Sequence, residues 1–533
     1  MSKRLTYLGL ALLGGVLPAI GWPPHKLSFL LFFAFVPFLL LETHFVEKKR
    51  GIWFGLYAYL GLFVFNLITT WWVWNASPGG AVFMLFANSF LMLIPFLSYR
   101  FCKKILGQGR GLLMFIATWL TFEYFHFRWD LNYPWLTLGN GFATSTSLVQ
   151  WYEYTGAPGG SLWILLSNAL IFLLVTQYKR SIAVCTALLL LVPIGWSWIL
   201  GRTQNTCKAK NEILIIQPNI DPYKKFDAGK DVEQLELFLK LCQEGVTPDT
   251  RLIVLPETAL VGNTNETYLS RSYAVRQLKA FLSQHPGVGM LIGASTHRFY
   301  KEGESLPPYP RYYEPEDRYY DSYNTAVQLK SDGSIELYHK SKLVPGVESL
   351  PFPQFFKEFD AILKLDFGGE SGNLGKDKQA KTFYYEAPDT TSKPQLGVAP
   401  LICYESIFGE YVGDFVRKKA TVLAVITNDG WWKNTAGHKQ HMHYARLRAI
   451  EYRRYVIRSA NTGISCVIDD NGNVLEELGW WQEGSIRARV PSLTYETFYS
   501  RSGDYLGKLA VFIFVFMGLS IVVKWRVQKS ELK

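Results

Sequence analysis

The sequence predicts an α-helical membrane bundle joined to an α/β layered domain, and three observations support this fold class. Residues 1–200 consist mainly of apolar runs, residues 201–506 have the mixed composition of a soluble domain, and residues 509–523 are apolar again. Overall, 49% of the residues are hydrophobic and 19% are charged, against about 25% charged in typical soluble chains. We therefore expect seven membrane helices in 1–200, a soluble domain at 201–506, and a C-terminal membrane helix with a tail at 507–533.

Eight apolar segments approach the length of a membrane-spanning helix, which needs about 20 mainly apolar residues. The second and the last are short, so bilayer thinning or snorkelling must compensate. The first could instead be a signal peptide, but several further spans follow it, so we expect it to be retained. The expected spans are Leu5–Trp22, Leu27–Leu41, Gly51–Trp74, Ala81–Tyr99, Gly111–Phe127, Ser161–Thr176, Ile182–Leu200 and Leu509–Val523.

Basic residues near the segment ends predict the orientation in the membrane. Lys and Arg precede the first span and follow the second, fourth, sixth and eighth, whereas the alternate short loops carry few. Both termini are therefore expected in the cytoplasm and the soluble domain on the opposite side, which in a bacterium is the periplasm. This topology accounts for much of the net charge of +11, so we do not infer a nucleic-acid partner from that charge.

The loop expected at 132–160 is rich in aromatic residues, among them Trp135, Trp151 and Tyr152. Aromatic residues at this depth are often anchors at the membrane interface. The alternative is a rim beneath the soluble domain, where lipid enters. The sequence leaves both interpretations open.

Short β-branched runs alternate with helix-like stretches in the soluble part, which is typical of an α/β layered domain. The Asp332-Gly333 pair predicts a hairpin turn, because glycine accepts a positive φ. Two stretches, 301–320 and 368–379, are expected to be loops or insertions. The expected strands are Ile213–Ile216, Leu252–Leu255, Met290–Ile292, Ala326–Leu329, Gly397–Ile402, Thr421–Thr427 and Ser465–Ile468, and the expected helices are Asp231–Glu244, Tyr268–His285 and His438–Arg454.

Three polar residues stand at or just past the ends of apolar runs: Glu257, Lys340 and Cys403. Strand ends are where α/β domains form their sites. A cysteine nucleophile needs a proton acceptor, and the oxyanion that it forms needs a cation or N–H donors, so the three residues meet these needs without histidine. Taken alone, each residue is more often structural: such a cysteine is usually a small buried hydrophobe, and such a lysine is usually solvated.

The sequence around these three residues resembles the catalytic blocks of the nitrilase, or carbon–nitrogen hydrolase, superfamily, in the same order. The blocks are Leu255-Pro-Glu-Thr, Tyr338-His-Lys-Ser-Lys-Leu-Val-Pro followed by Glu348, and Leu401-Ile-Cys-Tyr-Glu. The whole chain resembles the apolipoprotein N-acyltransferases, the membrane-bound branch of that superfamily, since the nitrilase-like part lies between the seventh and eighth spans. The resemblance implies a nitrilase-type αββα sandwich for the soluble domain.

The resemblance also implies roles for individual residues. Glu257 is the expected general base, Cys403 the nucleophile that carries an acyl thioester, and Lys340 the group that stabilises the tetrahedral intermediate. Glu348 matches a supporting acidic residue of the family, and a structural ion pair is the alternative for it. The further residues with an implied supporting or substrate-binding role are Tyr404, Glu405, Asn428 and Trp431.

The implied reaction is a ping-pong acyl transfer in the bacterial inner membrane, without a metal or cofactor. A phospholipid gives an acyl chain, at sn-1, to Cys403, and the α-amine of the N-terminal diacylglyceryl-cysteine of a lipoprotein then takes it from the thioester. Confinement of both lipid-anchored substrates to the bilayer raises their effective concentration. Water must be kept from the thioester, and we expect a lid such as 368–379 to do this.

Other functions are weighed against this one. A membrane-tethered hydrolase of small amides would use the same three residues, and a non-catalytic binding protein would keep only the fold. A transporter usually needs more ionisable residues in its spans than Glu123 and His126.

Two departures from the family pattern put the shape of the substrate pocket in doubt. Gly346 and Val347 replace the expected Phe-Gly before Glu348, and Phe226 stands where a tryptophan is expected. A zinc site is the other alternative, suggested by the histidines at the start of one expected helix. No acidic or cysteine ligand lies near these histidines in the sequence, so we expect no metal. The histidines are His438, His441 and His443.

Overall fold

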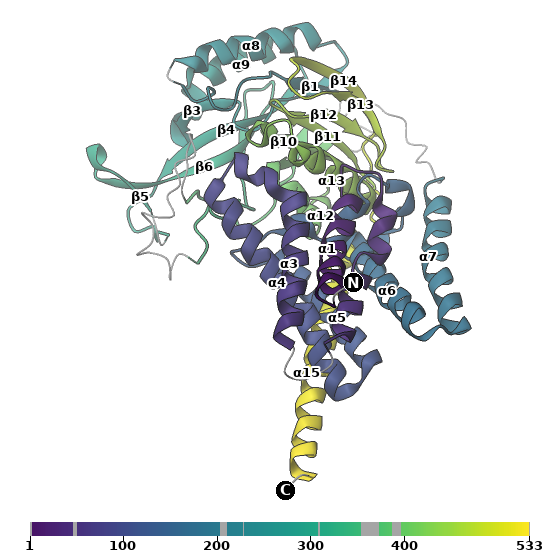
Figure 1. Ribbon diagram of the computed structural model, residues 1–533. Helices are drawn as coiled ribbons and strands as arrows, with labels where there is room; N and C mark the ends of the chain where they lie inside the picture. The colour runs from purple at the N-terminus through teal and green to yellow at the C-terminus, as the bar shows by residue number, and fades with distance from the viewer. Residues whose placement is uncertain are drawn as a thin grey trace. The chain divides into compact units, whose positions relative to one another are not determined.

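The computed structural model describes residues 3–45, 51–202, 211–227, 229–307, 310–352, 373–385 and 396–531. The chain forms two compact units, whose elements are labelled in Figure 1. The helical unit comprises residues 1–74, 78–203 and 502–533, and the α/β unit comprises residues 75–77 and 204–501.

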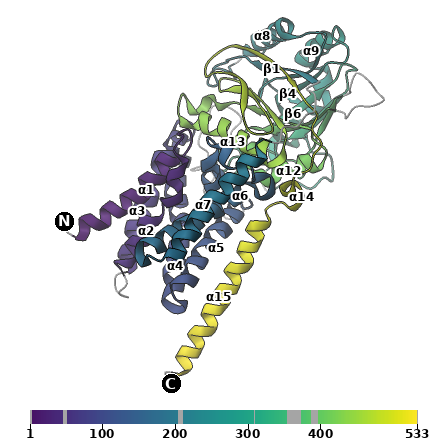
Figure 2. The ribbon, with the colours of Figure 1, turned by 90° about the vertical axis from the view of Figure 1, so that its right-hand side faces the viewer.

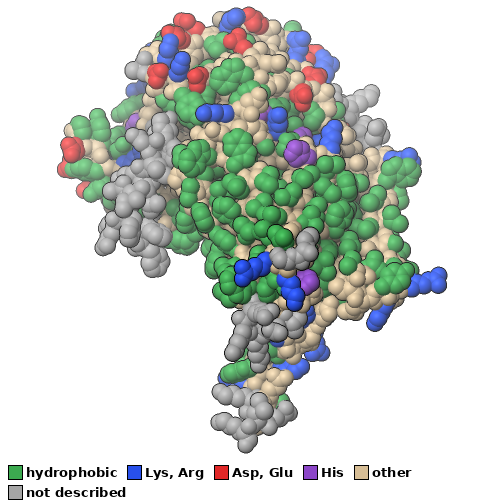
Figure 3. Space-filling model, viewed as in Figure 1, with side chains coloured by type: hydrophobic (Ala, Val, Ile, Leu, Met, Phe, Trp, Pro, Cys, Tyr) green, Lys and Arg blue, Asp and Glu red, His purple; other side chains and the backbone are tan. Residues whose placement is uncertain are grey.

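Six helices of the helical unit are long and apolar enough to cross a membrane, and Figure 2 shows them from a second side. They are α1 (Lys3–Gly21), α3 (Gly51–Thr70, prolonged by η3, Trp71–Asn75), α4 (Pro78–Leu106), α6 (Tyr152–Gln177), α7 (Arg180–Leu200) and α15 (Tyr505–Glu531). Large apolar side chains are exposed on them, such as Leu191 at 66% and Phe512 at 68%, and hydrophobic side chains dominate the surface of this unit in Figure 3. Soluble proteins rarely expose so much apolar surface, so the chain is a multi-pass membrane protein.

Two of the eight expected spans are not among these six. The segment expected at 27–41 is divided into η1 (Ser28–Phe33) and α2 (Val36–Thr43), with Pro37 in the first turn of α2. The segment expected at 111–127 is a continuous helix, α5 (Gln108–His126), but it is buried along most of its length. Polar residues of membrane segments face the interior of the helical bundle, and α5 buries Glu123 and His126 in this way. The described residues therefore contain several membrane helices without establishing the number eight.

Helices α1 and α3 approach each other closely at two glycines. A Cβ atom added to Gly15 would lie 2.2 Å from the carbonyl oxygen of Gly61, and one added to Gly61 would lie 2.2 Å from the carbonyl oxygen of Ala11. Any side chain at either position would push the two backbones apart. Small residues at such contacts are typical of membrane helices, which associate by close packing rather than by the hydrophobic effect.

The aromatic segment expected as a loop at 132–160 is partly helical and largely buried. Three short turns precede α6: η4 (Pro134–Leu136), η5 (Leu138–Phe142) and η6 (Thr146–Leu148). Helix α6 already begins at Tyr152 and is interrupted at Gly156, where φ is 62°. Trp135 and Trp151 pack on other tryptophans of the unit, with ring centroids 5.0 and 5.6 Å apart, and are at most 5% exposed. Neither an interfacial anchor nor an exposed rim describes these two side chains, which belong to the core of the helical unit.

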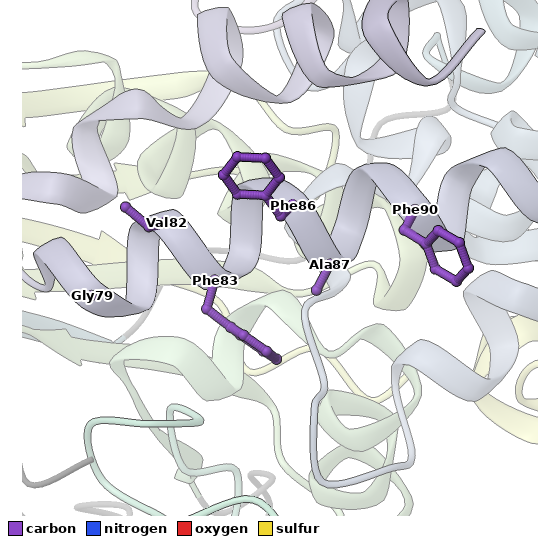
Figure 4. A pocket seen from close by; sticks show the side chains of 6 residues that line it. All are labelled: Gly79, Val82, Phe83, Phe86, Ala87 and Phe90. Atoms are coloured by element: carbon purple, nitrogen blue, oxygen red, sulfur yellow. The ribbon is translucent and has the colours of Figure 1, made fainter. Parts of the chain in front are cut away.

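A shallow hollow lies on the exposed face of α4, and Figure 4 shows the side chains that border it. All of these residues are apolar, whereas ligand sites usually add a few polar groups that fix the orientation of the ligand. The hollow therefore suits hydrocarbon rather than a polar ligand. It is lined by Gly79, Val82, Phe83, Phe86, Ala87 and Phe90.

The α/β unit contains two β-sheets (Figure 1). The strands of the first sheet are β1 (Asn211–Gln217), β2 (Thr250–Val254), β3 (Leu260–Asn265), β4 (Gly289–Phe299), β5 (Arg311–Tyr313), β6 (Arg318–Leu329), β7 (Ile335–His339) and β14 (Gly484–Val490). Those of the second are β8 (Phe383–Tyr385), β9 (Leu396–Ile402), β10 (Val422–Thr427), β11 (Tyr455–Ala460), β12 (Ser465–Ile468) and β13 (Val474–Leu478). The first sheet has the order β14-β1-β2-β4-β6-β5, with β3 beside β4 and β7 beside β6. The second has the order β13-β12-β11-β10-β9-β8.

The side chains of β1 show how the layers of the unit arise. Ile213 and Ile215 point into the core between the two sheets, whereas Leu214 and Ile216 point into a second core beneath two helices. Successive side chains of a strand alternate between its faces, so an apolar strand such as β1 must be covered on both sides. The helices over the first sheet are α8 (Lys230–Gly245) and α9 (Tyr273–Ser283), and those over the second are α12 (Gly409–Arg417) and α13 (Ala436–Tyr452). The unit is therefore an αββα sandwich.

The seven strands and three helices expected in this unit each overlap an observed element. The expected hairpin at Asp332-Gly333 joins β6 to β7, and Gly333 has a φ of 80°. The stretch 301–320, expected as a loop, contributes β5 and the start of β6, which pair antiparallel. No expected strand corresponds to β3, β5, β8, β11, β13 or β14, which are short or carry polar residues and so lack a long apolar run.

We expect Gly61→Ala to destabilise the helical unit and Gly9→Ala, on α1, to leave it unchanged. The methyl group added at Gly61 meets backbone atoms, which cannot move aside, and overpacking of this kind costs about 1–3 kcal/mol. A Cβ added to Gly9 has no neighbour within 4 Å, and alanine favours a helix over glycine. Thermal unfolding of both variants in the same detergent measures the difference, and equal midpoints would contradict the close approach of α1 and α3.

Candidate active site

The strands that carry the three expected catalytic residues end near one another. Glu257 lies three residues past β2, Lys340 directly follows β7, and Cys403 directly follows β9. The first two strands belong to one sheet and β9 belongs to the other. The three side chains interact, because the charges of Glu257 and Lys340 both shift the pKa of the Cys403 thiol. The site is therefore assembled across the two sheets of the sandwich.

Cys403 occupies a strained backbone conformation. Its φ is 49°, in the left-handed region that costs a non-glycine residue roughly 1–2 kcal/mol. The residue turns the chain from β9 into the short helix η10 (Cys403–Ile407). Burial and the Glu257 carboxylate raise the pKa of the Cys403 thiol, and Lys340 offsets only part of this rise. The thiol is therefore neutral at rest and needs a base to become a nucleophile.

The Glu257 carboxylate is held by three donors. Asn324 Nδ2 donates to Oε1 at 2.8 Å, Lys340 Nζ donates to the same oxygen at 3.2 Å, and the backbone N–H of Asn428 donates to Oε2 at 3.0 Å. Glu257 is only 6% exposed, and a buried carboxylate needs such partners to remain charged. A charged Glu257 is able to accept the proton of a neighbouring thiol.

Lys340 lies between two carboxylates. Its Nζ is 3.2 Å from Glu257 Oε1 and 2.7 Å from Glu348 Oε1, and its side chain is 1% exposed. Burial alone would lower the pKa of Lys340, but the Glu257 and Glu348 carboxylates outweigh burial and hold this pKa well above its usual value. Lys340 is therefore a permanent cation, suited to stabilise an oxyanion rather than to exchange protons.

Glu348 is an ion-pair partner of Lys340 and is also fixed to the backbone. Its Oε2 accepts a hydrogen bond from the N–H of Val344 at 2.9 Å. The supporting role and the ion pair, which the sequence analysis treated as alternatives, describe the same contact, because the cation that Glu348 pairs with is Lys340.

Glu405 joins the loop after Lys340 to the turn at Cys403. Its Oε1 accepts from the N–H of Ser341 at 2.7 Å and from the hydroxyl of Tyr338 at 2.5 Å, and its Oε2 accepts from the N–H of Ile402 at 2.9 Å. The side chain is fully buried, and burial raises the pKa of Glu405 to about 7. Glu405 thus connects two segments of the site rather than facing a substrate.

Tyr404 and Trp431 make aromatic contacts near the site. The Tyr404 ring is buried and packs edge-on against Phe408, with centroids 5.2 Å apart. Trp431 is half-buried and packs edge-on against Tyr223 at 5.3 Å.

Two further residues contact Glu257 and were not expected from the sequence. One is Asn324, the donor described above, which lies inside β6. The other is Lys225, which is 1% exposed and whose Nζ donates to the backbone oxygen of Glu257 and to Thr258 Oγ1, both at 2.8 Å. Thr258 has a φ of 49°, so Lys225 holds a strained turn. Burial lowers the pKa of Lys225 to about 7 although Glu257 opposes this.

The three histidines considered for zinc have different surroundings. His438 Nε2 lies 3.2 Å from Asn434 Oδ1. His441 forms a group with Cys403 and Asp429, whose potential ligand atoms all lie within 4.8 Å of one another. Asp429, however, is paired with the buried guanidinium of Arg458, and a fixed cation beside the group opposes a second one. The donor set therefore does not favour a metal ion.

The described part of the expected lid is anchored next to Lys340. His339, the last residue of β7, has Nδ1 3.0 Å from Asp377 Oδ1 and Nε2 2.7 Å from Glu266 Oε1. The hydroxyl of Ser341 also donates to the backbone oxygen of Asp377 at 2.8 Å. Asp377 is thus fixed to the residues on either side of Lys340. Residues 368–372 lie outside the part of the chain that the structure describes.

Comparison with known proteins identifies the family. A family model described as carbon-nitrogen hydrolase matches residues 214–499, and one described as apolipoprotein N-acyltransferase N-terminal domain matches residues 14–170. An apolipoprotein N-acyltransferase of Chlorobaculum tepidum is 30% identical over 535 residues, which cover 97% of each chain. The chain belongs to the apolipoprotein N-acyltransferase family. Another member, from Geobacter metallireducens, is 28% identical over 94% of this chain and 92% of its own length.

Among solved structures, Saccharomyces cerevisiae Nit3, described as a member of branch 10 of the nitrilase superfamily, is 18% identical to this chain. The similarity covers 56% of this chain and 95% of that chain, with a TM-score of 0.34. The carbon-nitrogen hydrolase match and the αββα layers together make the α/β unit a nitrilase-type domain.

We expect Lys225→Met to slow the acyl transfer expected of this family by about tenfold to a hundredfold. A small misplacement of a reacting group has effects of this size. The variant removes the donor to the backbone of Glu257. Its matched control is Lys224→Met, the adjacent and exposed lysine, which should react at the rate of the wild-type protein. Equal rates for both variants, with both folded, would show that Lys225 does not position Glu257.

The contacts of His339 predict a pH-dependent stability. Burial opposes the charge of His339, but Asp377 and Glu266 outweigh it and raise its pKa from 6.5 to about 9. Since this pKa is raised on folding, the stabilisation is complete below about pH 6.5 and is lost as the pH rises through about 9. At ~1.4 kcal/mol for each pKa unit, it amounts to at most about 3 kcal/mol.

The measurement is the unfolding free energy of the wild-type protein and of His339→Gln, compared across this range. The difference between them should be largest near pH 6 and should shrink towards pH 10. A difference that stays constant with pH would contradict the proposed charge on His339.

Proposed function

We propose that this protein is an apolipoprotein N-acyltransferase that moves a fatty acyl chain from a phospholipid, through a thioester on Cys403, to the α-amine of an N-terminal diacylglyceryl-cysteine on a lipoprotein. One observation carries the proposal. The neutral thiol of Cys403 lies close enough to a buried carboxylate, Glu257, and a buried cation, Lys340, for both charges to shift its pKa. The full-length similarity to apolipoprotein N-acyltransferases supports this choice of donor and acceptor.

In the first half-reaction, Glu257 takes the proton of the Cys403 thiol as the sulfur attacks the carbonyl carbon of the phospholipid acyl ester, at sn-1. A C–S bond forms, and the carbonyl oxygen becomes an oxyanion that the Lys340 ammonium stabilises. The C–O bond to the glycerol then breaks. Glu257 returns the proton to the leaving oxygen, so lysophospholipid departs and the carboxylate is regenerated.

In the second half-reaction, the neutral α-amine of the acceptor attacks the thioester carbonyl. A C–N bond forms, Lys340 again faces the oxyanion, and Glu257 takes a proton from the attacking nitrogen. When the C–S bond breaks, Glu257 gives this proton to the sulfur, which restores the Cys403 thiol. The products are an amide-linked, triacylated lipoprotein and the free enzyme, so atoms and protons balance over the cycle.

We further propose the topology that this reaction needs. The protein lies in the bacterial inner membrane with eight spans: the six apolar helices, the segment 27–41 and α5. Seven spans lie in residues 1–200, the catalytic domain occupies residues 201–506, and the last span with a tail lies in residues 507–533. Both termini are cytoplasmic and the nitrilase-type domain is periplasmic. The alternation of Lys and Arg between the short loops supports this orientation.

A second candidate function is hydrolysis of a small amide, because the matching family model is that of the carbon-nitrogen hydrolases. Both reactions begin with attack by Cys403, and they differ in whether water or an amine resolves the thioester. A hydrolase of soluble amides would form no stable adduct with a phospholipid, which makes the two functions separable by experiment.

We expect an acyl adduct on the protein after incubation with 1-palmitoyl-2-oleoyl phosphatidylethanolamine alone. Intact-mass analysis should show a palmitoyl group, released by hydroxylamine, on the wild-type protein and on the control variant Cys466→Ala, whose cysteine is buried on β12. Cys403→Ala should carry none, and Glu257→Gln should acylate ~10²–10⁴ times more slowly, the usual effect of losing a general base.

An oleoyl adduct would correct the position of the acyl donor while keeping the thioester. No adduct on a folded wild-type protein would contradict the proposal and favour the amide hydrolase. Addition of a diacylglyceryl-cysteine peptide should then discharge the adduct and transfer its mass to the peptide.

A further inference from the structure

A cluster of buried polar side chains lies behind the nucleophile and plays no part in the reaction described above. It consists of His441 on α13, Asp429 in the short helix η11 (Asp429–Trp432), Ser406 on η10 and Arg458 on β11. All four residues are at most 1% exposed. Burying charged groups is costly unless each has a partner. The contacts of the cluster therefore indicate its role.

The cluster contacts the backbone of Cys403 through His441 and Ser406. The Nε2 atom of His441 lies 3.2 Å from the carbonyl oxygen of Cys403 and 2.9 Å from Ser406 Oγ. The Ser406 hydroxyl in turn donates to the same carbonyl oxygen at 2.8 Å. The carbonyl oxygen of the nucleophile is therefore held by two side chains that come from different helices.

The opposite side of His441 is fixed as well. Its Nδ1 lies 2.9 Å from Asp429 Oδ1, and the other carboxylate oxygen of Asp429 is paired with Arg458. The Thr427 hydroxyl donates to Asp429 Oδ1 at 2.7 Å. Thr427 also acts on the thiol of Cys403, whose pKa it lowers, so Asp429 is tied to a residue on the thiol side of the nucleophile.

The nucleophile needs such contacts because its backbone is strained. A non-glycine residue with a φ of 49° persists only where the surrounding structure over-determines its conformation. Relaxation of this turn would rotate the peptide that carries Cys403 and would move its thiol relative to Glu257 and Lys340, which belong to the other sheet.

We propose that His441 is a positioning residue for the nucleophile: its Nε2 side, together with Ser406, holds the carbonyl of Cys403 in the left-handed turn that aims the thiol at Glu257. This inference rests on the proposed function in so far as Cys403 is taken as the nucleophile. Arg458 orients the imidazole from behind, because its Nη2 lies 3.2 Å from Nδ1 and also pairs with Asp429. With Nδ1 as the acceptor, the neutral ring carries its N–H on Nε2, where it donates to the Cys403 carbonyl.

A metal ion is the competing explanation, since Cys403, Asp429 and His441 offer three ligand atoms within 4.8 Å of one another. The Arg458 guanidinium argues against it. Its Nη2 contacts Asp429 and lies 3.2 Å from His441 Nδ1. A divalent cation here would have to displace a buried, fixed positive charge.

Two substitutions separate the two sides of His441. In His441→Asn the amide replaces Nδ1, so it keeps the contact with Asp429 and loses the contact with the Cys403 carbonyl. In His441→Gln the amide replaces Nε2, so it keeps the contact with the Cys403 carbonyl and loses the contact with Asp429. The matched control is His438→Asn, one turn earlier on α13, where the histidine contacts Asn434 and the ring of Trp480 instead.

Two readouts apply to each folded variant: the single-turnover rate of acylation by phospholipid, and the rate of alkylation of Cys403 by iodoacetamide, followed on the Cys403 peptide. We expect His441→Asn to lose ~100-fold in acylation rate, the scale of a small misplacement of a reacting group, and to be alkylated more slowly. The half-saturating phospholipid concentration should not change. His441→Gln should stay within about threefold of the wild-type protein, and His438→Asn should match it.

Equal losses in His441→Asn and His441→Gln would overturn the inference, because they would indicate a structural role without a preferred side. Wild-type rates in both variants would also overturn it, as would stoichiometric zinc binding by the wild-type protein that is lost in His441→Asn. Should His441→Asn fail to fold, Ser406→Ala removes the other donor to the carbonyl and is expected to slow acylation by about tenfold.

Failure of the proposed function has a different signature. A wild-type protein that forms no acyl adduct but still shows the alkylation pattern expected of the variants would reject the acyl donor and keep the positioning role of His441. A wild-type protein that acylates, with variants that all behave alike, would keep the function and reject the inference.

Discussion

The structure of the site depends on keeping one ammonium group charged in a place that excludes water. Lys340 is 1% exposed and is flanked by Glu257 and Glu348. Removing either carboxylate would leave a buried, under-compensated cation, which is among the most destabilising changes that a protein can suffer. The two carboxylates are themselves largely shielded from water, so each needs hydrogen-bond donors in addition to Lys340. Asn324 and two backbone N–H groups meet that need.

Strain at the ends of two strands is the second element of the design. Thr258 after β2 and Cys403 after β9 both have a φ of 49°, and each is held by a buried side chain from a distant part of the chain. Lys225 holds the first turn, and His441 with Ser406 holds the second. Glu257 and Cys403 therefore stand at rigid strand ends on different sheets, which gives better control of their geometry than flexible loops would.

The sequence was informative where function and local pattern coincide in a few consecutive residues. The blocks around Glu257, Lys340 and Cys403 predicted the three residues that the fold brings together, and fully apolar runs predicted strands that are buried on both faces. Lys225 was not predicted as part of the site, and His441 was considered only as a zinc ligand. Their partners lie more than 30 residues away in the sequence, and a lysine beside another lysine, or a histidine on a helix, has no local mark of burial.

The membrane part shows the same limit in another form. The loop was expected to continue to residue 160, but α6 starts at Tyr152 and includes Gly156 and Pro158. Neighbouring helices compensate for such residues in membrane helices. The apolar run at 27–41 predicted one span, whereas the chain divides it in two. Hydropathy records composition, and it does not record whether backbone hydrogen bonds continue through a segment.

Glu405 makes the loop that carries Lys340 and the turn that carries Cys403 parts of one unit, because a single carboxylate accepts hydrogen bonds from both. The two segments are therefore expected to change together during evolution. A change in the backbone path of one segment would move the Glu405 carboxylate, which accepts a hydrogen bond from the other segment. Diversity in this family should therefore concentrate in segments that this carboxylate does not touch. Chimeras that exchange only one of the two segments between distant relatives would inherit mismatched halves, whereas exchanging both together with Glu405 would carry the whole junction intact.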